Sequence, residues 1–276
     1  MAHRKDGMTQ ISKLNVGHLK SVPKTLLVTL KAKYEASIDP NYSFKDPILE
    51  DLYEKIDDPL KESDLFFLLK RGVILRTKAF DYLLKKEIKK RETPPTIIHL
   101  PCGLDTRYHR LAEKLGPCQW YDCDLPEVIE LRKHFFKEKA PYKMRAIDIL
   151  NPHWPKAISN VSDPIILMEG LSMYLDHDKL QLFFHSLSTF FDHYTLILDF
   201  ISPFFVHKEW MLPAMEQFDV QFSWGTKRGK DFKIFDSNLS CEEELGLLDP
   251  YKKSFPFGET LIEALFKQKN MALLRK

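Results

Sequence analysis

The sequence has little cysteine and no long apolar run. Its four cysteines are Cys102, Cys118, Cys123 and Cys241, and the chain begins MAHRKDGMTQ, without an apolar leader segment. These features disfavour a secreted, disulfide-bonded protein, so we expect reduced thiols and a cytoplasmic location. No stretch reaches the roughly 18 apolar residues that a membrane-spanning helix needs. We therefore expect a soluble protein with no membrane partner.

The sequence also lacks a charge excess of either sign. It carries 41 Lys and Arg against 39 Asp and Glu, a formal net charge of +2. Proteins that bind DNA or RNA through the phosphates usually show a strong basic excess, so nucleic acid is not an expected partner. The 276 residues, 44% of them hydrophobic, are enough for a sizeable core in one or two domains.

Glycine is scarce where several known motifs need it. The turn around Gly103 lacks the three glycines of a dinucleotide fingerprint, and Pro101 supplies no backbone N–H for a pyrophosphate. Residues 225–230 have one residue too few between their glycines for a phosphate-binding loop. Residues 170–174 lack the second glycine of a nucleophile elbow. These absences disfavour a nicotinamide or flavin dehydrogenase, a P-loop protein and a serine hydrolase.

No group of residues has a convincing metal-site spacing. Asp122 and Asp124 form a D-x-D sequence, but on a strand both face one side, and no further ligands lie nearby in the sequence. His99 and Cys102 do not have the spacing of a zinc site. We therefore expect no metal.

The pattern of apolar residues changes at the Thr-Pro-Pro sequence of residues 93–95. Before it, residues 64–92 have apolar side chains at a period near 3.6, which predicts a long amphipathic helix. We expect residues 1–95 to form a helical N-terminal cap and residues 96–276 to form the core domain.

After the prolines, short runs rich in Ile, Leu and Val predict strands. The runs are residues 96–100, 119–124, 144–149, 165–169 and 196–201. Helical patterns lie between them at 126–139 and 176–191. This alternation predicts a doubly wound α/β fold, with a parallel sheet covered by helices on both faces. Residues 203–231 break the alternation, and we expect a lid insertion there.

Acidic residues end the predicted strands, at the edge where open parallel sheets bind ligands. Asp148 and Glu169 end the third and fourth strands, and Asp124 ends the second, 21 positions after Gly103. That interval brings Asp124 beside the first turn, where a carboxylate accepts both hydroxyls of a ribose. The alternative is that Asp124 caps the helix that begins at Pro126, and the two roles are compatible.

Arg76 lies on the apolar stripe of the predicted long helix, three residues after Val73 and four before Phe80. Its side chain should therefore point inward. A buried guanidinium must be paired, because burying an unpaired charge costs several kcal/mol. Either Arg76 forms an internal ion pair with one of the strand-end acids, or its fork binds the carboxylate of a ligand.

Three motifs carry a family likeness: His-Leu-Pro-Cys-Gly-Leu-Asp-Thr-Arg at 99–107, Tyr-Asp-Cys-Asp-Leu-Pro-Glu-Val at 121–128 and Met-Glu-Gly-Leu-Ser-Met-Tyr-Leu at 168–175. In this order they resemble the leucine carboxyl methyltransferase family, including its bacterial polyketide-methylating relatives. The likeness covers most of the chain apart from the lid and the tail. It implies a seven-stranded, mostly parallel, Rossmann-like methyltransferase sheet with a helical N-terminal cap, and it implies S-adenosylmethionine as the cofactor.

The resemblance also implies roles at the methionine end of the cofactor. Arg76 would clasp the methionine carboxylate, and Glu169 would lie near the amino-acid portion. Lys31 would be a further cofactor-binding residue, and Tyr174 would border the site of methyl transfer.

At the nucleoside end, the resemblance implies that Gly103 lets the cofactor approach the first turn and that Asp124 holds the ribose. Asp148 and Ile149 would flank the adenine. The sequence departs from the family at one point, because Pro101 stands where the first turn usually has the first glycine of a G-x-G.

The sequence shows no catalytic dyad, and methyl transfer does not require one. A sulfonium carries an activated methyl group, so the protein mainly aligns an acceptor oxygen and excludes water. A carboxylate, with a pKa of about 4, arrives ionised, whereas a phenol, with a pKa of about 10, needs a general base. We therefore expect an S-adenosylmethionine-dependent O-methyltransferase that acts on a small-molecule carboxylate, with a hydroxyl group or a protein C-terminus as variant acceptors.

The predicted lid is rich in large apolar side chains, which either form the acceptor wall or cover the sheet. They are Phe204, Phe205, Trp210, Met211, Met215, Phe218, Phe222 and Trp224. Two other functions stay open at this point: a nicotinamide-dependent oxidoreductase, and a non-catalytic ligand-binding member of the fold. The sequence does not determine the oligomeric state.

Overall fold

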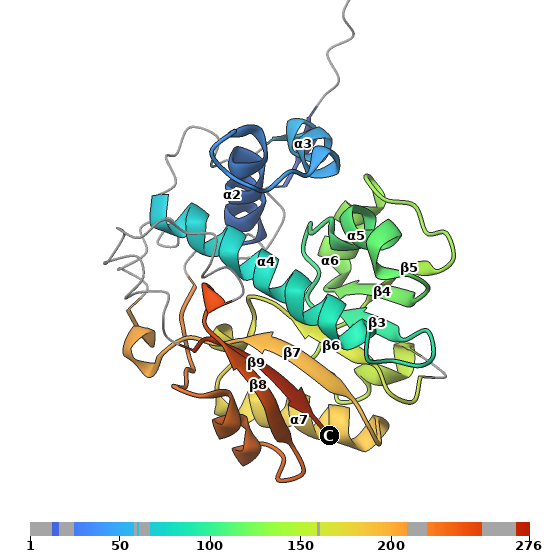
Figure 1. Cartoon of the computed structure of the whole chain (residues 1–276), viewed down its shortest axis with the longest axis vertical. Coiled ribbons are helices and arrows are strands. Elements are labelled where there is room, and N and C mark those ends of the chain that lie inside the picture. Colours follow the sequence, from blue (N-terminus) through green and yellow to red (C-terminus); the bar gives the residue numbers. More distant parts are fainter. Residues whose placement is uncertain are drawn as a thin grey trace, which may run out of the picture.

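The computed structural model describes residues 13–16, 25–57, 60, 67–158, 161–208, 220–249 and 269–276 (Figure 1). In these described ranges, three helices precede the main sheet: α2 (Leu26–Ile38), α3 (Pro47–Glu54) and α4 (Phe67–Ile88). The long helix α4 confirms the helix that the apolar periodicity predicts at 64–92. Two short strands, β1 (Leu14–Asn15) and β2 (Ile56–Asp57), pair in parallel. The division into a cap domain and a core domain stays a prediction.

The main sheet has seven strands in the order β5-β4-β3-β6-β7-β9-β8. They are β3 (Thr96–His99), β4 (Gln119–Asp124), β5 (Tyr142–Ala146), β6 (Ile165–Met168), β7 (Thr195–Asp199), β8 (Ser240–Leu245) and β9 (Met271–Arg275). Neighbours from β5 to β7 are parallel, and β9 runs antiparallel to β7 and β8. The seven-stranded, mostly parallel α/β sheet is confirmed. The apolar runs predict β3 to β7 but do not predict β8 and β9.

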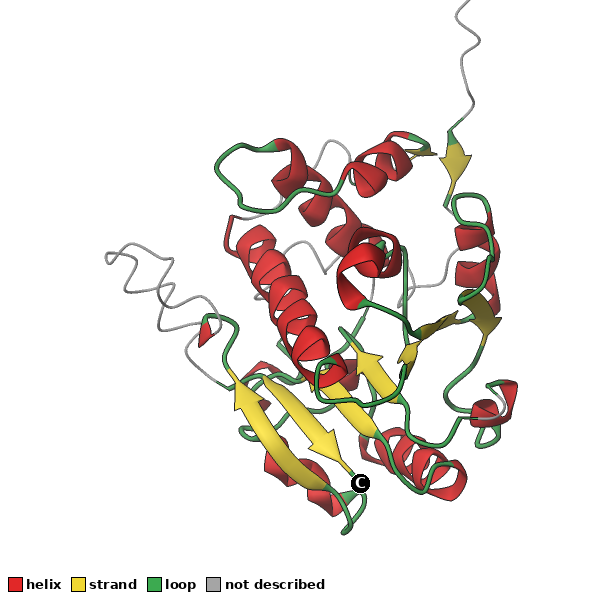
Figure 2. Cartoon of the chain, turned by 45° about the vertical axis from the view of Figure 1, so that its right-hand side comes forward, coloured by secondary structure: helices red, strands yellow, loops and turns green. Residues whose placement is uncertain are grey.

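Alternate residues of the central strands enter two cores, one on each face of the sheet. Ile97 packs in the same core as Leu83 of α4, whereas Ile98 packs in the same core as Phe183 of α7 (His177–Phe190). Figures 1 and 2 show α4 crossing one face of the sheet and α7 lying on the other. Because both faces are covered, the strands need apolar residues at successive positions, which explains their continuous apolar runs.

Helices α5 (Arg107–Leu115) and α6 (Pro126–Lys133) follow β3 and β4. The prediction that the second of these helices extends to residue 139 is wrong, because α6 ends at Lys133. The chain after it turns back toward β5, and the Glu138 carboxylate accepts a hydrogen bond from the Met144 N–H at 2.6 Å. The described residues also form short 3₁₀ helices: η1 (Trp154–Ala157), η2 (Ser172–Tyr174), η3 (Pro203–Phe205) and η5 (Gly229–Ile234).

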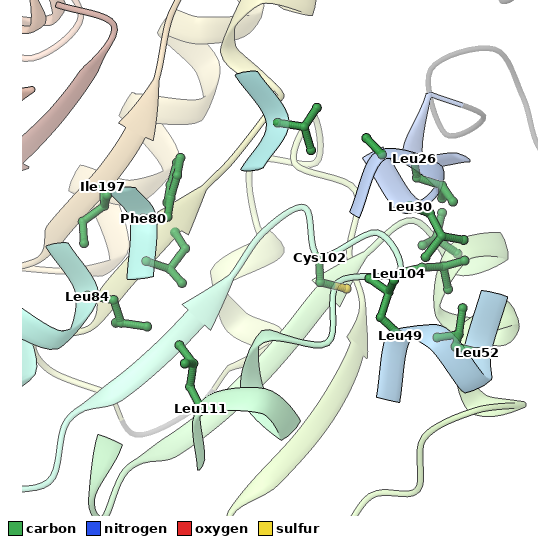
Figure 3. Close-up of a cluster of buried hydrophobic side chains, with 14 of the residues drawn as sticks. Leu26, Leu30, Leu49, Leu52, Phe80, Leu84, Cys102, Leu104, Leu111 and Ile197 are labelled. Carbon is green, nitrogen blue, oxygen red and sulfur yellow. The ribbon is translucent and has the colours of Figure 1, made fainter. Parts of the chain in front are cut away.

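The strand order places a crevice beside the turn that follows β3. From β3 the chain continues to β4 on one side, while β6 pairs with β3 on the other side. The connections from these strands therefore separate at their carboxyl ends, where ligands of open α/β sheets bind. Figure 3 shows Cys102 and Leu104, on the turn after β3, near Leu26 of α2 and Leu49 of α3. The N-terminal helices thus pack directly on this turn.

Only parts of the predicted lid, residues 203–231, are among the described residues. Trp224 packs against Phe232 and Phe235, with ring centroids 4.9 and 5.6 Å apart, and so helps to cover the sheet. Phe204 is exposed. Trp210, Met211, Met215 and Phe218 lie outside the described residues. The role of the lid as an acceptor wall stays a prediction.

Within the described part of the chain, none of the helices combines the length and the apolar character that a membrane span requires.

Candidate active site

A cavity of about 280 Å³ lies at the carboxyl edge of β3, β4 and β6. Small-molecule sites usually measure roughly 300–1,000 Å³, so the cavity is near the lower end of that range. Residues 99–105, 124–125, 147–150 and 169–171 line it from the sheet, while α2 and Arg76 line it from the N-terminal side. Of the cofactor-binding residues that the sequence predicts, all except Lys31 line this cavity.

Asp124 links the turns that follow β3 and β4. Its Oδ2 accepts a hydrogen bond from the Gly103 N–H at 2.7 Å, and its Oδ1 accepts one from the Leu125 N–H at 2.8 Å. Gly103 has a φ of 48°, in the left-handed region that glycine adopts without a Cβ penalty. The N-cap residue of α6 is Leu125, so the alternative prediction that Asp124 caps this helix is wrong. Each Asp124 oxygen has capacity for one further hydrogen bond from a ligand.

Burial raises the pKa of Asp124 to about 6, although the hydrogen bonds from Gly103 and Leu125 act in the opposite direction. Among the described residues, no lysine, arginine or histidine forms an ion pair with it. A buried carboxylate without a direct cation is a strong acceptor for the hydroxyls of a ligand. Its charge is therefore available to bind a diol.

Asp148 and Ile149 line the same cavity on the connection that follows β5. The Ile147 N–H donates to the Asp124 carbonyl oxygen at 2.7 Å, which fixes this connection against the end of β4. Asp148 Oδ1 accepts a hydrogen bond from the Leu150 N–H at 2.9 Å. The structure thus brings both predicted adenine-flanking residues to the side of the cavity that Asp124 occupies.

Arg76 extends from α4 to the ends of β6 and β7. Its Nε is 3.1 Å from Glu169 Oε1, and its Nη1 is 3.2 Å from Asp199 Oδ2. A Cβ at position 170 would lie 3.3 Å from the Arg76 guanidinium, so Gly170 allows this close approach. The predicted internal ion pair is confirmed. Because Arg76 also lines the cavity, its role in binding a ligand carboxylate stays a prediction.

Arg107, the first residue of α5, is fully buried at the centre of a charged network. Its Nη2 donates to Glu169 Oε2 at 2.6 Å, and its Nε donates to Asp81 Oδ1 at 2.9 Å. Its Nη1 lies 3.2 Å from both Asp105 Oδ2 and His99 Nε2. The guanidinium thus joins α4, β3, the following turn and β6.

Lys33 brings a second cation to this end of the cavity from α2. Its Nζ lies 2.9 Å from Asp105 Oδ2, and its side chain is only 7% exposed. Burial raises the pKa of Glu169, but the charges of Arg107, Lys33 and Arg76 outweigh burial and lower it to about 2. The pKa of Asp105 is likewise well below its usual value, because Arg107 and Lys33 outweigh its burial. Both carboxylates are therefore ionised at neutral pH.

Two predicted site residues do not line the cavity. Lys31 donates to the carbonyl oxygen of Leu60, and Lys33, two residues further along α2, lines the cavity instead. Tyr174 packs against Phe222, with ring centroids 5.5 Å apart. Roles for Lys31 in cofactor binding and for Tyr174 in methyl transfer stay predictions.

Three backbone N–H groups of the turn after β3, those of Cys102, Gly103 and Asp105, are hydrogen-bonded within the protein. The Cys102 N–H donates to the Cys123 carbonyl at 2.9 Å, and the Asp105 N–H donates to the Cys102 carbonyl at 3.0 Å. The Gly103 N–H is taken by Asp124, and Pro101 has none. A pyrophosphate would require several such donors, so this turn does not suit a dinucleotide. Within the described ranges, no cluster of three or more His, Cys, Asp and Glu residues could hold a metal ion.

Three charged residues of the site, Lys33, Arg107 and Asp199, are not predicted as site residues from the sequence. Arg107 is the last residue of the first motif, so its position was visible but its inward orientation was not. Asp199 lies inside the fifth predicted strand, 196–201, and becomes a strand-end acid only because β7 ends at Asp199 in the structure. No local signal distinguishes Lys33 from Lys31, because which lysine faces the sheet depends on how α2 packs.

The family model for leucine carboxyl methyltransferases matches residues 31–188, more than half of the chain. The chain is 25% identical over 261 residues to the S-adenosyl-L-methionine-dependent methyltransferase dpfgK of Gibberella zeae, and the match covers 87% of each protein. It is 23% identical over 231 residues to the tetracenomycin polyketide synthesis O-methyltransferase TcmP of Streptomyces glaucescens, and covers 84% of this chain and 85% of TcmP.

The fold is similar to the crystal structure of a proposed methyltransferase from Thermobifida fusca YX. The TM-score is 0.59 at 13% sequence identity, over 97% of this chain and 96% of the other. At this identity the likeness supports the fold alone.

Proposed function

We infer that this chain, which belongs to the leucine carboxyl methyltransferase family, transfers a methyl group from S-adenosylmethionine to a carboxylate oxygen of a small molecule. The activity class and the cofactor follow from the family and from relatives described as S-adenosylmethionine-dependent and O-methyltransferases. The acceptor class and the roles of individual residues are our proposal. The observation that carries the acceptor class is that His99, Glu169 and Asp105, at the Arg76 end of the cavity, are all engaged with cations or poor as bases.

The side chains of the cavity fit the chemical groups of S-adenosylmethionine. The ribose has two neighbouring hydroxyl donors, and Asp124 offers two carboxylate oxygens. The methionine part has a carboxylate and an ammonium group, and the opposite end of the cavity holds Arg76 and Lys33 next to Glu169. Ile149 adds apolar surface on the side proposed for the adenine. The charges are therefore complementary at both ends.

His99 is the only histidine that lines the cavity in the described part of the chain, and both of its ring nitrogens contact protein groups. Nε2 lies 3.2 Å from Arg107 Nη1, and Nδ1 lies 3.2 Å from Asp122 Oδ1. Because arginine only donates, Nε2 accepts, and the Nδ1–H donates to Asp122. This histidine cannot take a proton from an acceptor without breaking the network.

The cavity carboxylates nearest to Arg76 are also poor bases. Glu169 has a pKa of about 2, and Asp105 has a pKa well below its usual value. A phenol or alcohol acceptor needs a base that removes its proton, whereas a carboxylate is already ionised at neutral pH. The described site therefore favours a carboxylate acceptor.

Bound S-adenosylmethionine supplies an activated methyl group, so the residues of this chain act by binding and orientation. Asp124 and the turn at Gly103 fix the nucleoside end. Arg76 and Lys33, together with Glu169, fix the amino-acid end. The N-terminal helices pack over the turn and keep water from that side of the cavity. Holding the two reactants in line is sufficient to produce a large rate increase.

A nicotinamide-dependent oxidoreductase is not favoured, because both the family match and the donor-poor turn after β3 argue against it. If the chain is a non-catalytic ligand-binding protein, it should bind the cofactor without transferring the methyl group. A protein C-terminus as acceptor stays the variant to test beside small carboxylates.

The test is a methyl-transfer assay with a radiolabelled methyl donor against three acceptor panels: small carboxylic acids, phenols, and peptides with a free C-terminus. We expect label in small-molecule methyl esters, which lose it on mild alkaline treatment, whereas methyl ethers keep it. Alkali-stable products would contradict the carboxylate proposal, and labelled peptides would replace the small-molecule acceptor with a C-terminus.

A further inference from the structure

We propose that Arg132 is a positioning residue for the nucleoside end of the cofactor site: its guanidinium holds the turn after β3 so that Gly103 and Asp124 present the correct groups to the ribose. The proposal rests on the assigned cofactor, and it concerns a residue that does not line the cavity. Arg132 therefore acts through the turn, without contact to the ligand.

Arg132 lies on α6, eight residues after Asp124 in the chain, and its side chain is fully buried. Its Nη1 donates to two backbone carbonyls of the turn, that of Gly103 at 2.8 Å and that of Asp105 at 2.9 Å. One nitrogen thus bridges both sides of Leu104 and fixes the curvature of the turn. The segment from β4 to α6 thus carries both Asp124, whose carboxylate is proposed to bind the ribose, and Arg132, whose guanidinium holds the turn after β3.

The other nitrogen of the guanidinium anchors Arg132 to the sheet. Its Nη2 donates to Asp122 Oδ2 and lies 3.1 Å from the Tyr142 hydroxyl. Tyr142 in turn donates to Asp122 Oδ2 at 2.8 Å, and Trp120 Nε1 donates to Asp122 Oδ1 at 2.8 Å. The centroid of the Phe136 ring lies 4.7 Å from the guanidinium carbon. The position of Nη1 is therefore set by β4 and β5, which are rigid elements.

Gly103 is held from two sides, and this links Arg132 to the site. Its carbonyl accepts from Arg132, while its N–H donates to Asp124. If the carbonyl is released, the turn can rotate, and the N–H no longer fixes one oxygen of Asp124. The carboxylate would then lose the orientation in which both oxygens face a diol.

This geometry requires arginine. The two turn carbonyls lie at Nη1, while Asp122 and Tyr142 lie at Nη2, and a planar guanidinium spans both sets. A lysine ammonium is a compact point charge that keeps the pairing with Asp122 but cannot serve both sets at once. Arg132→Lys therefore keeps the positive charge that pairs with Asp122 but removes the hydrogen bonds to the two turn carbonyls.

The experiment measures the dissociation constants of S-adenosylhomocysteine and of adenosine by calorimetry, on the full chain and well below its unfolding temperature. We expect Arg132→Lys to weaken both ligands by a similar factor of about ten. The matched control is Arg91→Lys, because Arg91 also pairs with a carboxylate, Asp163, but its guanidinium donates to Thr195 at the start of β7 instead of to the turn after β3. We expect that control to bind both ligands within about twofold of the wild type.

Tyr142→Phe gives a second, milder test if the lysine variant folds poorly. It removes the hydroxyl that contacts both Arg132 and Asp122 and keeps the guanidinium. We expect both ligands to weaken about threefold. A purely structural role would lower the free energy of unfolding but leave the dissociation constants of the folded protein unchanged.

Three results would overturn the role of Arg132. The first is a folded Arg132→Lys variant with wild-type affinities, and the second is a loss of affinity for S-adenosylhomocysteine while the affinity for adenosine is unchanged. The third, which applies if the lysine variant does not fold, is a Tyr142→Phe variant with wild-type affinities. A wild-type chain that binds no S-adenosylhomocysteine would instead overturn the cofactor assignment, and the role of Arg132 with it.

Discussion

The Asp124 carboxylate accepts a 2.7 Å hydrogen bond from the Gly103 N–H, 21 residues earlier in the chain. This contact joins the ends of two neighbouring parallel strands, and it sets the orientation of the carboxylate at the wall of the cavity.

Replacing Asp124 should weaken cofactor binding. Asp124→Ala removes two charge-assisted hydrogen bonds to the proposed ribose, each worth about 1.5–3 kcal/mol, so we expect the dissociation constant of S-adenosylhomocysteine to rise at least about tenfold. Calorimetry measures it directly. Asp51→Ala, at an exposed carboxylate that pairs with Lys55, serves as the control and should bind as the wild type. Equal affinities of the two variants would exclude the ribose role.

Cofactor binding should release protons below about pH 6. The pKa of Asp124 is raised from 3.8 to about 6 by burial, so the free protein holds a proton there at pH 5, whereas hydroxyl donors favour the ionised form. We expect affinity to increase from pH 5 to pH 7, and calorimetry in buffers of different ionisation enthalpy should detect a proton released at pH 5. Asp124→Asn should abolish this component, and its persistence in that variant would assign the proton to another group.

The same shift affects the stability of the free protein with the opposite sign. Because the folded pKa is raised, the contribution of Asp124 to the free energy of unfolding is present below about pH 4 and is lost as the pH rises through about 6. Urea unfolding of the wild type and of Asp124→Asn should therefore favour the wild type more at pH 4 than at pH 7. A difference that does not change with pH would contradict the raised pKa.

Arg76 should discriminate between ligands with and without a carboxylate. We expect Arg76→Ala to weaken S-adenosylhomocysteine at least about tenfold, because the charge-assisted fork to the methionine carboxylate is lost. Adenosine, which lacks that group, should bind within about twofold of the wild type. Arg145→Ala, at a partly exposed arginine paired with Glu138, is the control. If Arg76→Ala lowers only the free energy of unfolding, the internal ion pair is the whole role of this arginine.

Glu169 should stabilise the fold as well as the site. It joins Arg76 and Arg107, so Glu169→Gln removes the buried carboxylate that the two guanidinium groups share, and we expect a loss of about 3 kcal/mol in the free energy of unfolding. The exposed pair of Glu130 with Lys133 offers a control, and Glu130→Gln should cost less than about 1 kcal/mol.

The effect of Glu169 should depend on pH. Its folded pKa is lowered to about 2, so its contribution is present above about pH 4.5 and is lost as the pH falls toward 2. The stability difference between the wild type and Glu169→Gln should shrink over this range. A difference that stays constant down to pH 2 would show that the lowered pKa does not carry the effect.

The sequence predicts local features of the fold well, because their signals lie within a few residues. The period of 3.6 predicts α4, and the apolar runs predict β3 to β7. The helix predicted from residue 176 begins where the Asp176 side chain accepts a hydrogen bond from the Lys179 N–H at 2.9 Å. The predicted helix 126–139 extends past the observed end of α6, because Glu138 accepts a hydrogen bond from the Met144 N–H of β5 and helical periodicity carries no information on such a partner.

The sequence alone determined the alternation of β3 to β7 with helices and placed Asp124, Asp148 and Glu169 near strand ends, because apolar patterns and turn residues are local properties. Only the tertiary structure decided which side chains meet at that edge. Lys33 and Asp105 are 72 residues apart, and Arg76 and Asp199 are 123 residues apart. Their contacts depend on how α2 and α4 pack against the sheet and on the strand order, which arise from burial over the whole chain and leave no mark in any short segment.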